Sequence, residues 1–234
     1  MTDLSLVVPA YNEAGVVGDS VRRIDEFLRQ TDLSYEVVLG DDGSTDETSE
    51  EVEALGLSRV RVVRRPHRGK GAILTDALAE TEGDYAGFID ADLEIDVVYL
   101  PDFLAALEDG HDVAIGSKAL DPELNRHRPL SRRMTTTVYN LLARLLFRSP
   151  LSDHQAGFKL FRGELIRSLV ADVKNEGWLW DTEVLVACQR AGCSIKEIPV
   201  EAVRRREGHV GVITTSWTML RDMVRLYLAL NSDR

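Results

Sequence analysis

Short apolar runs alternate with segments of helical spacing through the first half of the chain, and this pattern constrains the fold most. The runs are rich in Val, Leu and Ile, as buried strands are, and they cover residues 4–8, 35–40, 60–63, 85–89 and 112–116. The segments between them, with apolar residues at helical spacing, cover residues 14–30, 46–55, 69–80 and 100–109. This alternation predicts an α/β fold with a mostly parallel sheet and helices on both faces. Sheets of this kind bind ligands beyond the carboxyl ends of their strands.

The second half of the chain is less regular, but it shows no linker, repeat or low-complexity segment. We expect helices over residues 132–147, 181–191 and 215–231, a strand over 194–200 and irregular structure over 149–161. A chain of 234 residues fits one large α/β domain. We therefore expect residues 1–234 to form a single domain, in which 121–234 complete the fold begun by 1–120.

The charge balance and the cysteine content limit the partners and the compartment. Asp and Glu outnumber Lys and Arg by 39 to 28, and the net charge of -11 argues against general nucleic-acid binding. Cys188 and Cys193 fit neither a metal motif nor a disulfide framework, which is typical of a reducing cytoplasm. The sequence has no signal-peptide pattern and no apolar run near the ~18 residues that span a bilayer. We expect a cytoplasmic protein that is at most peripheral at the cytoplasmic face of a membrane.

Polar clusters follow three of the predicted strands. The first strand is followed by Pro9-Ala10-Tyr11-Asn12-Glu13, the second by Asp41-Asp42-Gly43-Ser44 and the fourth by Asp90-Ala91-Asp92. Each cluster alone is most simply a turn, because Asp, Asn, Gly and Ser are ordinary turn residues. In a parallel sheet all three clusters meet at one edge, and their convergence indicates a ligand site.

The carboxylates that follow the fourth strand suit a divalent cation. In an extended backbone residues two apart face the same way, so Asp90 and Asp92 can address one point, and Glu94 continues the alternation. Oxygen ligands with open positions suit Mg²⁺ or Mn²⁺, which are often shared with substrate phosphates. The sequence shows no pattern for zinc or thiolate ligation.

Lys70 lies in a Gly69-Lys70-Gly71 turn at the start of a predicted helix. The turn lacks the spacing of a P-loop, and no G-x-G-x-x-G follows the first strand. The helix amides and Lys70 could favour a phosphate, or Lys70 could be an exposed lysine at a helix start. The residues alone leave both interpretations open.

The order and spacing of these clusters, together with Arg68-Gly69-Lys70-Gly71, resemble the family-two glycosyltransferases of GT-A fold. The likeness extends through residues 1–120 and implies a nucleotide-sugar-binding half, with residues 121–234 on the acceptor side. It also implies roles for individual residues. These are Pro9, Tyr11, Glu13, Asp42, Lys70, Asp90 and Lys118 for the nucleotide-sugar, Asp92 and Glu94 for a Mg²⁺ or Mn²⁺ cofactor, and Asp90, Asp92 and Asp153 for catalysis.

The second half resembles one branch of that family. The segments 116–118, 153–161 and 180–183 are similar to those of dolichyl-phosphate sugar synthases, and the D-x-Q-x-G-F-K-L-F form is closer to the glucosyltransferases than to the mannose enzymes. The resemblance implies transfer of a hexose from UDP-glucose or GDP-mannose to a polyprenyl phosphate. Two departures stand out: Lys118 replaces the usual Arg of the mannose enzymes, and residues 204–211 carry Val210 and Gly211 where the family loop has Ser and Lys.

A phosphate acceptor also fits the distribution of charge. A phosphate monoester is already anionic near neutral pH, so it needs cations to hold it and no general base. Between residues 125 and 152 there is no acidic residue, and the arginines there are Arg126, Arg128, Arg132, Arg133, Arg144 and Arg148. We expect Arg132 and Arg133, with Arg205 from the later loop, to bind the acceptor phosphate.

The predicted helix over residues 132–147 carries an apolar stripe beside these basic residues. The stripe consists of Met134, Val138, Leu141, Leu142, Leu145 and Leu146. It could contact a prenyl chain or a bilayer interface, or it could pack on the core as most amphipathic helices do. For the similar stripe on the last predicted helix, core packing is the simpler expectation.

Other functions would need other features of the sequence. A glycosyltransferase acting on a hydroxyl acceptor would need a base, which Asp153, Asp181 or Glu183 could supply, although Asp181 and Glu183 equally suit the start of a helix. A nucleotidyltransferase would have a glycine-rich, lysine-containing start, which is missing after residues 4–8. A non-catalytic binding protein would not need Asp90 and Asp92.

Overall fold

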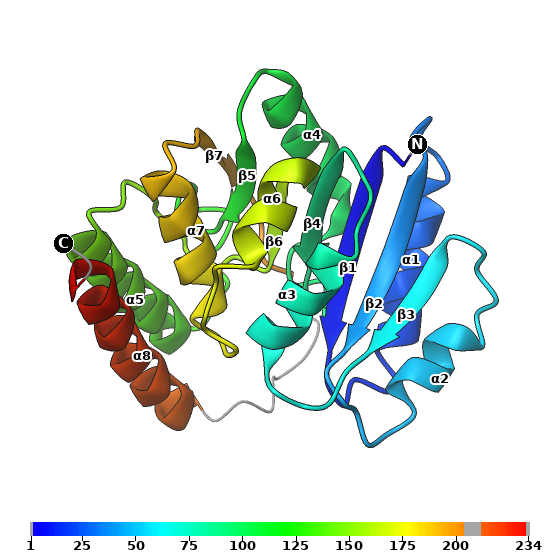
Figure 1. The fold of residues 1–234 in the computed structure, drawn as a ribbon, viewed down its shortest axis with the longest axis horizontal. Coiled ribbons are helices and arrows are strands. Elements are labelled where there is room, and N and C mark those ends of the chain that lie inside the picture. The colour runs from blue at the N-terminus through cyan, green and yellow to red at the C-terminus, as the bar shows by residue number, and fades with distance from the viewer. Residues whose placement is uncertain (1, 204–211, 233–234) are drawn as a thin grey trace.

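The computed structural model describes residues 2–203 and 212–232, and its centre is a seven-stranded sheet with the order β3-β2-β1-β4-β6-β5-β7 (Figure 1). The strands are β1 Leu4–Ala10, β2 Tyr35–Asp41, β3 Val60–Arg64, β4 Tyr85–Ile89, β5 Val113–Ser117, β6 Phe158–Arg162 and β7 Ile195–Pro199. The helices are α1 Val17–Leu28, α2 Thr48–Glu53, α3 Lys70–Ala79, the 3-10 helix η1 Val97–Tyr99, α4 Leu100–Glu108, α5 Leu130–Phe147, α6 Gly163–Val170, α7 Trp180–Arg190 and α8 Val212–Ser232. Every strand pair is parallel except those of β6, which runs antiparallel to β4 and β5.

The predicted α/β architecture is confirmed, and the predicted strands and helices are all present. The prediction was wrong over residues 149–161, where irregular structure was expected, because β6 begins at Phe158. Lys159 interrupts the apolar run of β6, and its side chain is nevertheless fully buried. A buried lysine hides a core strand from an argument based on hydrophobicity, since the tertiary partner that compensates the charge is distant in the sequence.

Two hydrophobic layers cover the sheet, one on each face. On one face the sheet packs against α1, α2 and α4, through residues such as Ile24 and Phe103. On the other face it packs against α3, α6 and α7, where Trp180 lies edge-on to Phe88 with ring centroids 5.8 Å apart. The helices on both faces leave the strand ends, and the loops that follow them, as the place for polar groups.

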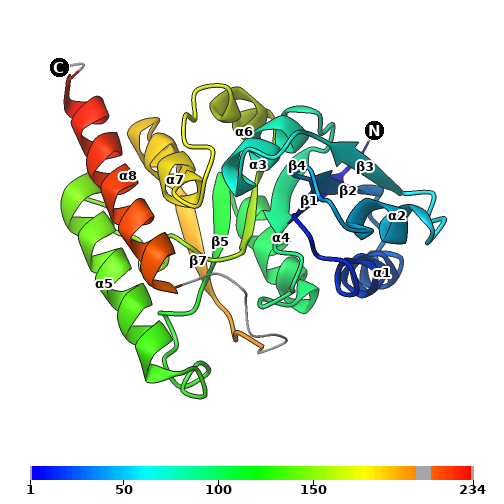
Figure 2. The same cartoon turned by 90° about the horizontal axis from the view of Figure 1, so that it is seen from below.

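Helices α5 and α8 lie side by side at one end of the molecule, beside α7 and far from α2 (Figures 1 and 2). Their contact is small and apolar, with Ala143 and Met223 buried between them and Leu179. Within residues 2–203 and 212–232, no helix combines the length and hydropathy needed to cross a membrane.

Candidate active site

The loops that follow β1 and β2 are bound to each other at the carboxyl edge of the sheet. Asn12 has a φ of 54°, in the left-handed region that Asn adopts more readily than most residues. Its Oδ1 accepts a hydrogen bond of 2.8 Å from the Thr45 amide, and its own amide donates to Ser44 Oγ over 3.0 Å. The Glu13 amide donates to Thr48 Oγ1 over 2.8 Å. The backbone that carries Tyr11 and Glu13 is therefore fixed by side chains from the β2–α2 segment.

Asp42 organises the turn that leads into α3. Its buried carboxylate accepts hydrogen bonds of 2.9 Å from the amides of Arg68 and Gly69, and His67 Nδ1 lies 2.8 Å from Oδ2. Hydrogen bonds from backbone amides to a carboxylate fix its position. In this structure Asp42 positions the start of α3, and the expected contact with a nucleotide remains a prediction.

An exposed aromatic pair lies beside this turn. The rings of Tyr11 and His67 stack with centroids 4.0 Å apart and an interplanar angle of 17°, and Tyr11 is 41% exposed. Pro9 lies within β1 opposite Gly40 and is buried, so it shapes the strand and does not present a side chain to solvent. The stacked pair is a flat apolar surface of the kind on which a nucleotide base can rest.

The Gly69-Lys70-Gly71 turn is packed closely against the loop before α7. A Cβ at Gly69 would lie 2.4 Å from the Glu176 carbonyl oxygen, and one at Gly71 would lie 2.5 Å from the Asn175 carbonyl oxygen. The Ala72 amide, in the first turn of α3, donates to the Glu176 carbonyl over 3.1 Å. The glycines thus allow a close backbone approach, and at least one amide of the helix start already has a partner.

Asp90 follows β4 and is held against the segment before β6. Its amide donates to the Gly157 carbonyl over 2.8 Å, and a Cβ at Gly157 would lie 2.1 Å from Asp90 Oδ2. Asp92 lies in the next turn, and Leu93 adopts a left-handed φ of 47°. The two aspartates are therefore arranged by a turn and not by the extended backbone that was expected.

Asp92 differs from its neighbours Asp90 and Glu94, each of which forms an ion pair with a lysine ammonium. Desolvation, with repulsion from Asp90, raises the pKa of Asp92, even though the Glu94 amide donates to Oδ1 over 2.9 Å. The residue itself is exposed. An exposed carboxylate is suited to a cation brought by a ligand.

Lys70 connects Asp90 to a second, fully buried lysine. Its Nζ lies 2.8 Å from Asp90 Oδ1 and 3.4 Å from Asp181 Oδ2. Asp181 Oδ1 in turn accepts a 2.5 Å hydrogen bond from Lys159 Nζ, which also donates to the Ala156 carbonyl over 2.6 Å. Alternating positive and negative groups thus run from the core to the edge of the sheet, and we call Lys159, Asp181, Lys70 and Asp90 the charge chain.

The protonation states of the charge chain follow from burial and from its neighbours. Burial would lower the pKa of Lys70, but the carboxylates of Asp181 and Asp90 outweigh this effect and raise it. Burial would raise the pKa of Asp181, but Lys159 and Lys70 outweigh this effect and lower it. For Lys159, burial prevails over the attraction of Asp181, so its pKa is lowered. Asp181 is therefore a poor proton acceptor.

A second cluster of charges surrounds Lys118. Its Nζ lies 3.2 Å from Glu94 Oε2 and 4.0 Å from Asp153 Oδ2, and Glu94 Oε1 is 3.9 Å from the guanidinium of Arg128. Burial would lower the pKa of Lys118, but Asp153 and Glu94 raise it overall. Asp153 is fully buried and accepts hydrogen bonds from the amides of Lys118 and Gln155. Glu94 thus lies between two cations.

The carboxylates at this edge fit a metal only as part of a site that the substrate completes. Among the described residues, no group of three or more His, Cys, Asp or Glu side chains is placed to hold a metal ion. Asp92 offers carboxylate oxygens, whereas Asp90 forms an ion pair with Lys70 and Glu94 forms one with Lys118. Mg²⁺ and Mn²⁺ commonly bind one or two carboxylates and take their other ligands from substrate phosphates and water. The donor set therefore fits such an ion.

Arg132 and Arg133, two of the residues expected to bind an acceptor phosphate, lie near the start of α5, a few residues after Arg128, whose guanidinium is 3.9 Å from Glu94 Oε1. Arg133 is half-buried on α5, the backbone of Arg132 lies in the same helix, and Arg205 lies outside the described residues. Most of the apolar stripe of α5 is exposed and does not pack on the core. Its most exposed members are Leu145 (69%) and Met134 (67%), followed by Val138 and Leu141, and Leu130 at the start of the helix is 71% exposed. In contrast, Leu142 and Leu146 pack toward α8.

Sequence reasoning missed several groups that build the site. Neither Lys159 nor the buried ion pairs of Asp181 were expected, since Asp181 was interpreted as a helix-opening acid or a base. Glu183 accepts hydrogen bonds from the amides of Lys174 and Asn175 and so holds the loop before α7. A lysine in the Phe-Lys-Leu-Phe run was the available signal, because a charge within such a run needs a buried partner.

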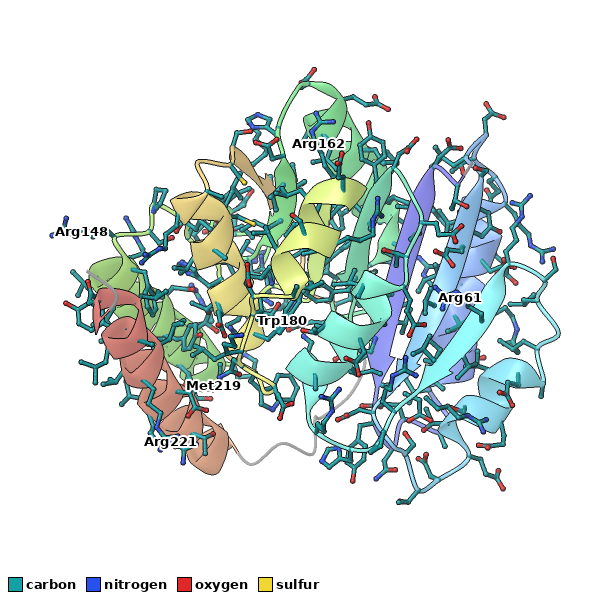
Figure 3. All side chains as sticks on the ribbon, in the orientation of Figure 1. Arg61, Arg148, Arg162, Trp180, Met219 and Arg221 are labelled. Atoms are coloured by element: carbon teal, nitrogen blue, oxygen red, sulfur yellow. The ribbon has the colours of Figure 1, made fainter. Side chains whose placement is uncertain are left out.

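A mixed α/β sheet with carboxylates, close glycines and a lysine in the loops that follow β1, β2, β3 and β4 is typical of glycosyltransferases of GT-A fold. Trp180, at the start of α7, lies in the centre of the molecule (Figure 3). Residues 5–170 match the Glycosyl transferase family 2 domain, and the chain belongs to this family. Glycosyltransferase AglD of Haloferax volcanii is 37% identical over 207 residues, which are 85% of this chain and 33% of AglD. The chain thus spans a third of the length of that relative.

Two further likenesses cover nearly the whole chain. Dolichyl-phosphate beta-glucosyltransferase of Saccharomyces cerevisiae is 29% identical over 248 residues, covering 97% of this chain and 74% of that protein. Glucosyl-3-phosphoglycerate synthase of Mycobacterium tuberculosis, in complex with Mn²⁺, UDP-glucose and glycerol 3-phosphate, matches with a TM-score of 0.73 and 25% identity, over 97% of this chain and 79% of that one. The same synthase with Mn²⁺, UDP and phosphoglyceric acid has a TM-score of 0.75 at 24% identity.

Proposed function

We propose that this glycosyltransferase moves a hexose from a nucleotide-sugar to a polyprenyl phosphate, with inversion at the anomeric carbon and with a divalent metal ion. UDP-glucose is the first donor to test and GDP-mannose the second. The dolichyl-phosphate beta-glucosyltransferases that are similar to this chain support both the sugar and the acceptor. The Mn²⁺ and UDP-glucose bound by glucosyl-3-phosphoglycerate synthase support the metal and the nucleotide.

The proposal of a phosphate acceptor rests mainly on the surroundings of the three carboxylates that could otherwise act as a general base. Asp181 is buried between Lys159 and Lys70, and these cations lower its pKa. Glu183 is bound to two backbone amides, and Asp153 is fully buried. A hydroxyl acceptor needs a base within hydrogen-bond reach, whereas a phosphate monoester brings its own negative charge. The phosphate acceptor is therefore the better match.

On the donor side, the stacked Tyr11 and His67 would face the base, and Glu13 and Asp42 lie in the loops around it. Lys70 would bind the diphosphate that Asp90 orients, and Lys118 would contact the sugar-phosphate from the other side. Asp92, with Glu94, would hold the metal ion. That ion would neutralise the charge that develops on the departing diphosphate. These assignments keep the predicted roles of Tyr11, Glu13, Asp42, Lys70, Asp90, Asp92, Glu94 and Lys118, add His67, and leave the buried Pro9 and Asp153 without a contact to the donor.

On the acceptor side, Arg132, Arg133 and Arg205 are the proposed ligands of the phosphate. The exposed stripe of α5 would lie against the prenyl chain and the surface of the membrane that contains it, as a peripheral contact. The arginines of α5 support this orientation, because the helix has no acidic residue. The protein would then act at the cytoplasmic face of a membrane.

The reaction is a single in-line displacement. An oxygen of the acceptor phosphate attacks the anomeric carbon, and the bond from that carbon to the diphosphate oxygen breaks. The nucleoside diphosphate leaves with the bonding electrons, so an α-linked donor gives a β-linked product. The enzyme contributes alignment and electrostatic stabilisation of the leaving group.

A transfer assay with radiolabelled donors tests this proposal. UDP-glucose and GDP-mannose are offered in parallel with a short polyprenyl phosphate and Mn²⁺ or Mg²⁺, at low and high salt. Label in the lipid fraction that depends on metal supports the proposal and identifies the donor. A glycan or glycolipid acceptor is run beside it, and label only in that product would replace the phosphate acceptor with a hydroxyl acceptor.

A further inference from the structure

The charge chain contains a residue with no assigned role, and it lies too deep to contact a substrate. Lys159 is fully buried in β6, and its ammonium is bound by Asp181 and the Ala156 carbonyl. The cost of burying an ammonium is several kcal/mol unless it is paired, so a strand-forming apolar residue would be the simpler choice for the core. The position of Lys159 therefore calls for an explanation beyond packing.

The geometry links Lys159 to Lys70 through a shared carboxylate. Asp181 uses Oδ1 for Lys159 at 2.5 Å and Oδ2 for Lys70 at 3.4 Å, so the closer pair is the one in the core. Lys70 in turn lies closer to Asp90, at 2.8 Å, than to Asp181. Both ammonium groups also lie over the Phe88 ring, 5.1 and 5.2 Å from its centroid. The two cations thus share one carboxylate, each through a different oxygen.

We propose that Lys159 is a positioning residue that neutralises Asp181 from the core, so that the Lys70 ammonium stays at Asp90 and is available to the donor diphosphate. This inference rests on the proposed donor role of Lys70. Without Lys159, Asp181 would keep a full negative charge with Lys70 as its remaining lysine partner. Lys70 would then be drawn toward Asp181. The net charge of the charge chain would also become more negative by one unit, which weakens the binding of an anion there.

The inference makes an unusual prediction for a double variant. Lys159→Met removes the cation and should weaken binding of the nucleoside diphosphate with Mn²⁺ by about tenfold, which is the effect of a ~1.4 kcal/mol change. Adding Asp181→Asn removes the unbalanced carboxylate as well. The double variant K159M/D181N should therefore bind the nucleoside diphosphate within about threefold of the unaltered chain.

Isothermal titration calorimetry with Mn²⁺ and either UDP or GDP measures this directly, without an acceptor. Titrating both nucleotides into the unaltered chain tests the proposed donor, so a wrong donor is visible before any variant is compared. Lys196→Met is the matched control, because it removes an exposed lysine of β7 and should leave the affinity unchanged. Thermal unfolding of each variant, with and without nucleotide, shows that the compared proteins are folded.

Two results would overturn the inference. If K159M is folded and binds like the unaltered chain, Lys159 has no influence on Lys70. If the double variant binds as weakly as K159M or more weakly, the loss comes from disturbed packing and not from the charge of Asp181. Recovery of affinity in the double variant, even if its melting temperature stays low, supports the positioning role, since a packing defect would not be reversed by a second core substitution.

Discussion

The carboxyl edge of the sheet around β1, β2 and β4 differs from the α5–α8 end of the molecule. Polar side chains at the edge are paired with one another, whereas large apolar side chains on α5 are exposed. At the edge, Asp42 has three hydrogen-bond donors and Lys70 lies between two carboxylates. On α5, Leu130, Met134 and Leu145 are each at least 67% exposed. The edge is thus organised by the fold itself, whereas α5 presents apolar surface that a further partner can cover.

This difference shows where specificity for each substrate can reside. A preorganised polar edge can discriminate a small, charged donor through fixed groups at short distances. A helix face with an apolar stripe and arginines recognises an extended amphiphile through area and charge, and it tolerates variation. Substitutions at the edge should therefore change the chemistry, and substitutions on α5 should change only how the acceptor is presented.

The largest expected effect is at the edge, in Asp92→Asn. Loss of the negative charge removes the main ligand proposed for the metal ion, so transfer should fall by about 1000-fold. The initial rate with Mn²⁺ and labelled donor measures this. Asp102→Asn, on the exposed first turn of α4, is the matched control and should have activity like that of the unaltered chain. Activity of D92N within tenfold of that of the control would contradict the metal role.

The next largest effect is expected for Gly157→Ala. The added methyl group would lie 2.1 Å from Asp90 Oδ2, so Asp90 must move, and displacement of a catalytic group by about 1 Å can cost 100-fold in rate. Gly177→Ala is the control, because its Cβ would meet Asn175 Oδ1 at an ordinary 3.5 Å. Equal rates for G157A and G177A, both folded by circular dichroism, would mean that the position of Asp90 is not critical.

A smaller and more selective effect is expected on α5. The double substitution Met134→Ser and Leu145→Ser removes two side chains that are 67% and 69% exposed, so the free energy of unfolding should change by less than about 1 kcal/mol. Transfer to a polyprenyl phosphate in vesicles should nevertheless fall by about tenfold, because less apolar area is available to the membrane.

Binding of the donor distinguishes this effect from a general defect. The affinity for nucleoside diphosphate with Mn²⁺ should stay unchanged in the α5 variant, and transfer to a detergent-solubilised short-chain acceptor should be less affected than transfer in vesicles. If the α5 variant loses activity equally with all acceptors, or loses donor affinity, then the two regions are not independent and the division between them is wrong.

The sequence predicted the edge of the sheet better than the α5–α8 end, for a physical reason. Polar clusters after buried strands are local signals, and Asp42, Lys70, Asp90 and Asp92 lie together at the predicted edge. Which groups neutralise them could not be predicted, because Lys70 meets Asp181 across 111 positions in the chain. For the same reason β6 was missed, since the partner that allows Lys159 in a core strand is itself a distant acid.

For α5 the sequence left two alternatives, and only the arrangement of helices could separate them. The stripe of Met134, Val138 and Leu141 has the same spacing whether it faces a core or the solvent. The structure turns Leu142, Ala143 and Leu146 toward α8 and leaves Met134, Val138 and Leu141 exposed.

The smallest expected effect concerns the joint between the two regions, where His154 connects the loop before β6 to α5. Asn140 Oδ1 accepts hydrogen bonds of 3.0 Å from the amide and from Nδ1 of His154, so Nδ1 carries the proton. Ser149 Oγ lies 2.8 Å from Nε2 and already accepts a hydrogen bond from Gln189, so its hydroxyl donates to Nε2. This network requires the neutral imidazole, and burial lowers the pKa of His154 to about 4.

The consequence is a loss of stability in mild acid. The unfolded chain binds a proton at His154 with a pKa near 6.5, and the folded chain does so only at about 4, so the stabilisation is complete above the unfolded value and is lost as the pH falls toward the folded one. Between pH 7 and pH 6 this group should lower the free energy of unfolding by roughly 0.7 kcal/mol.

His154→Gln should remove that part of the pH dependence, while His111→Gln, at a half-buried site before β5, should keep it. Chemical denaturation at the two pH values measures the difference. A variant H154Q as sensitive to acid as the unaltered chain would show that the joint between the edge and α5 does not depend on a neutral histidine.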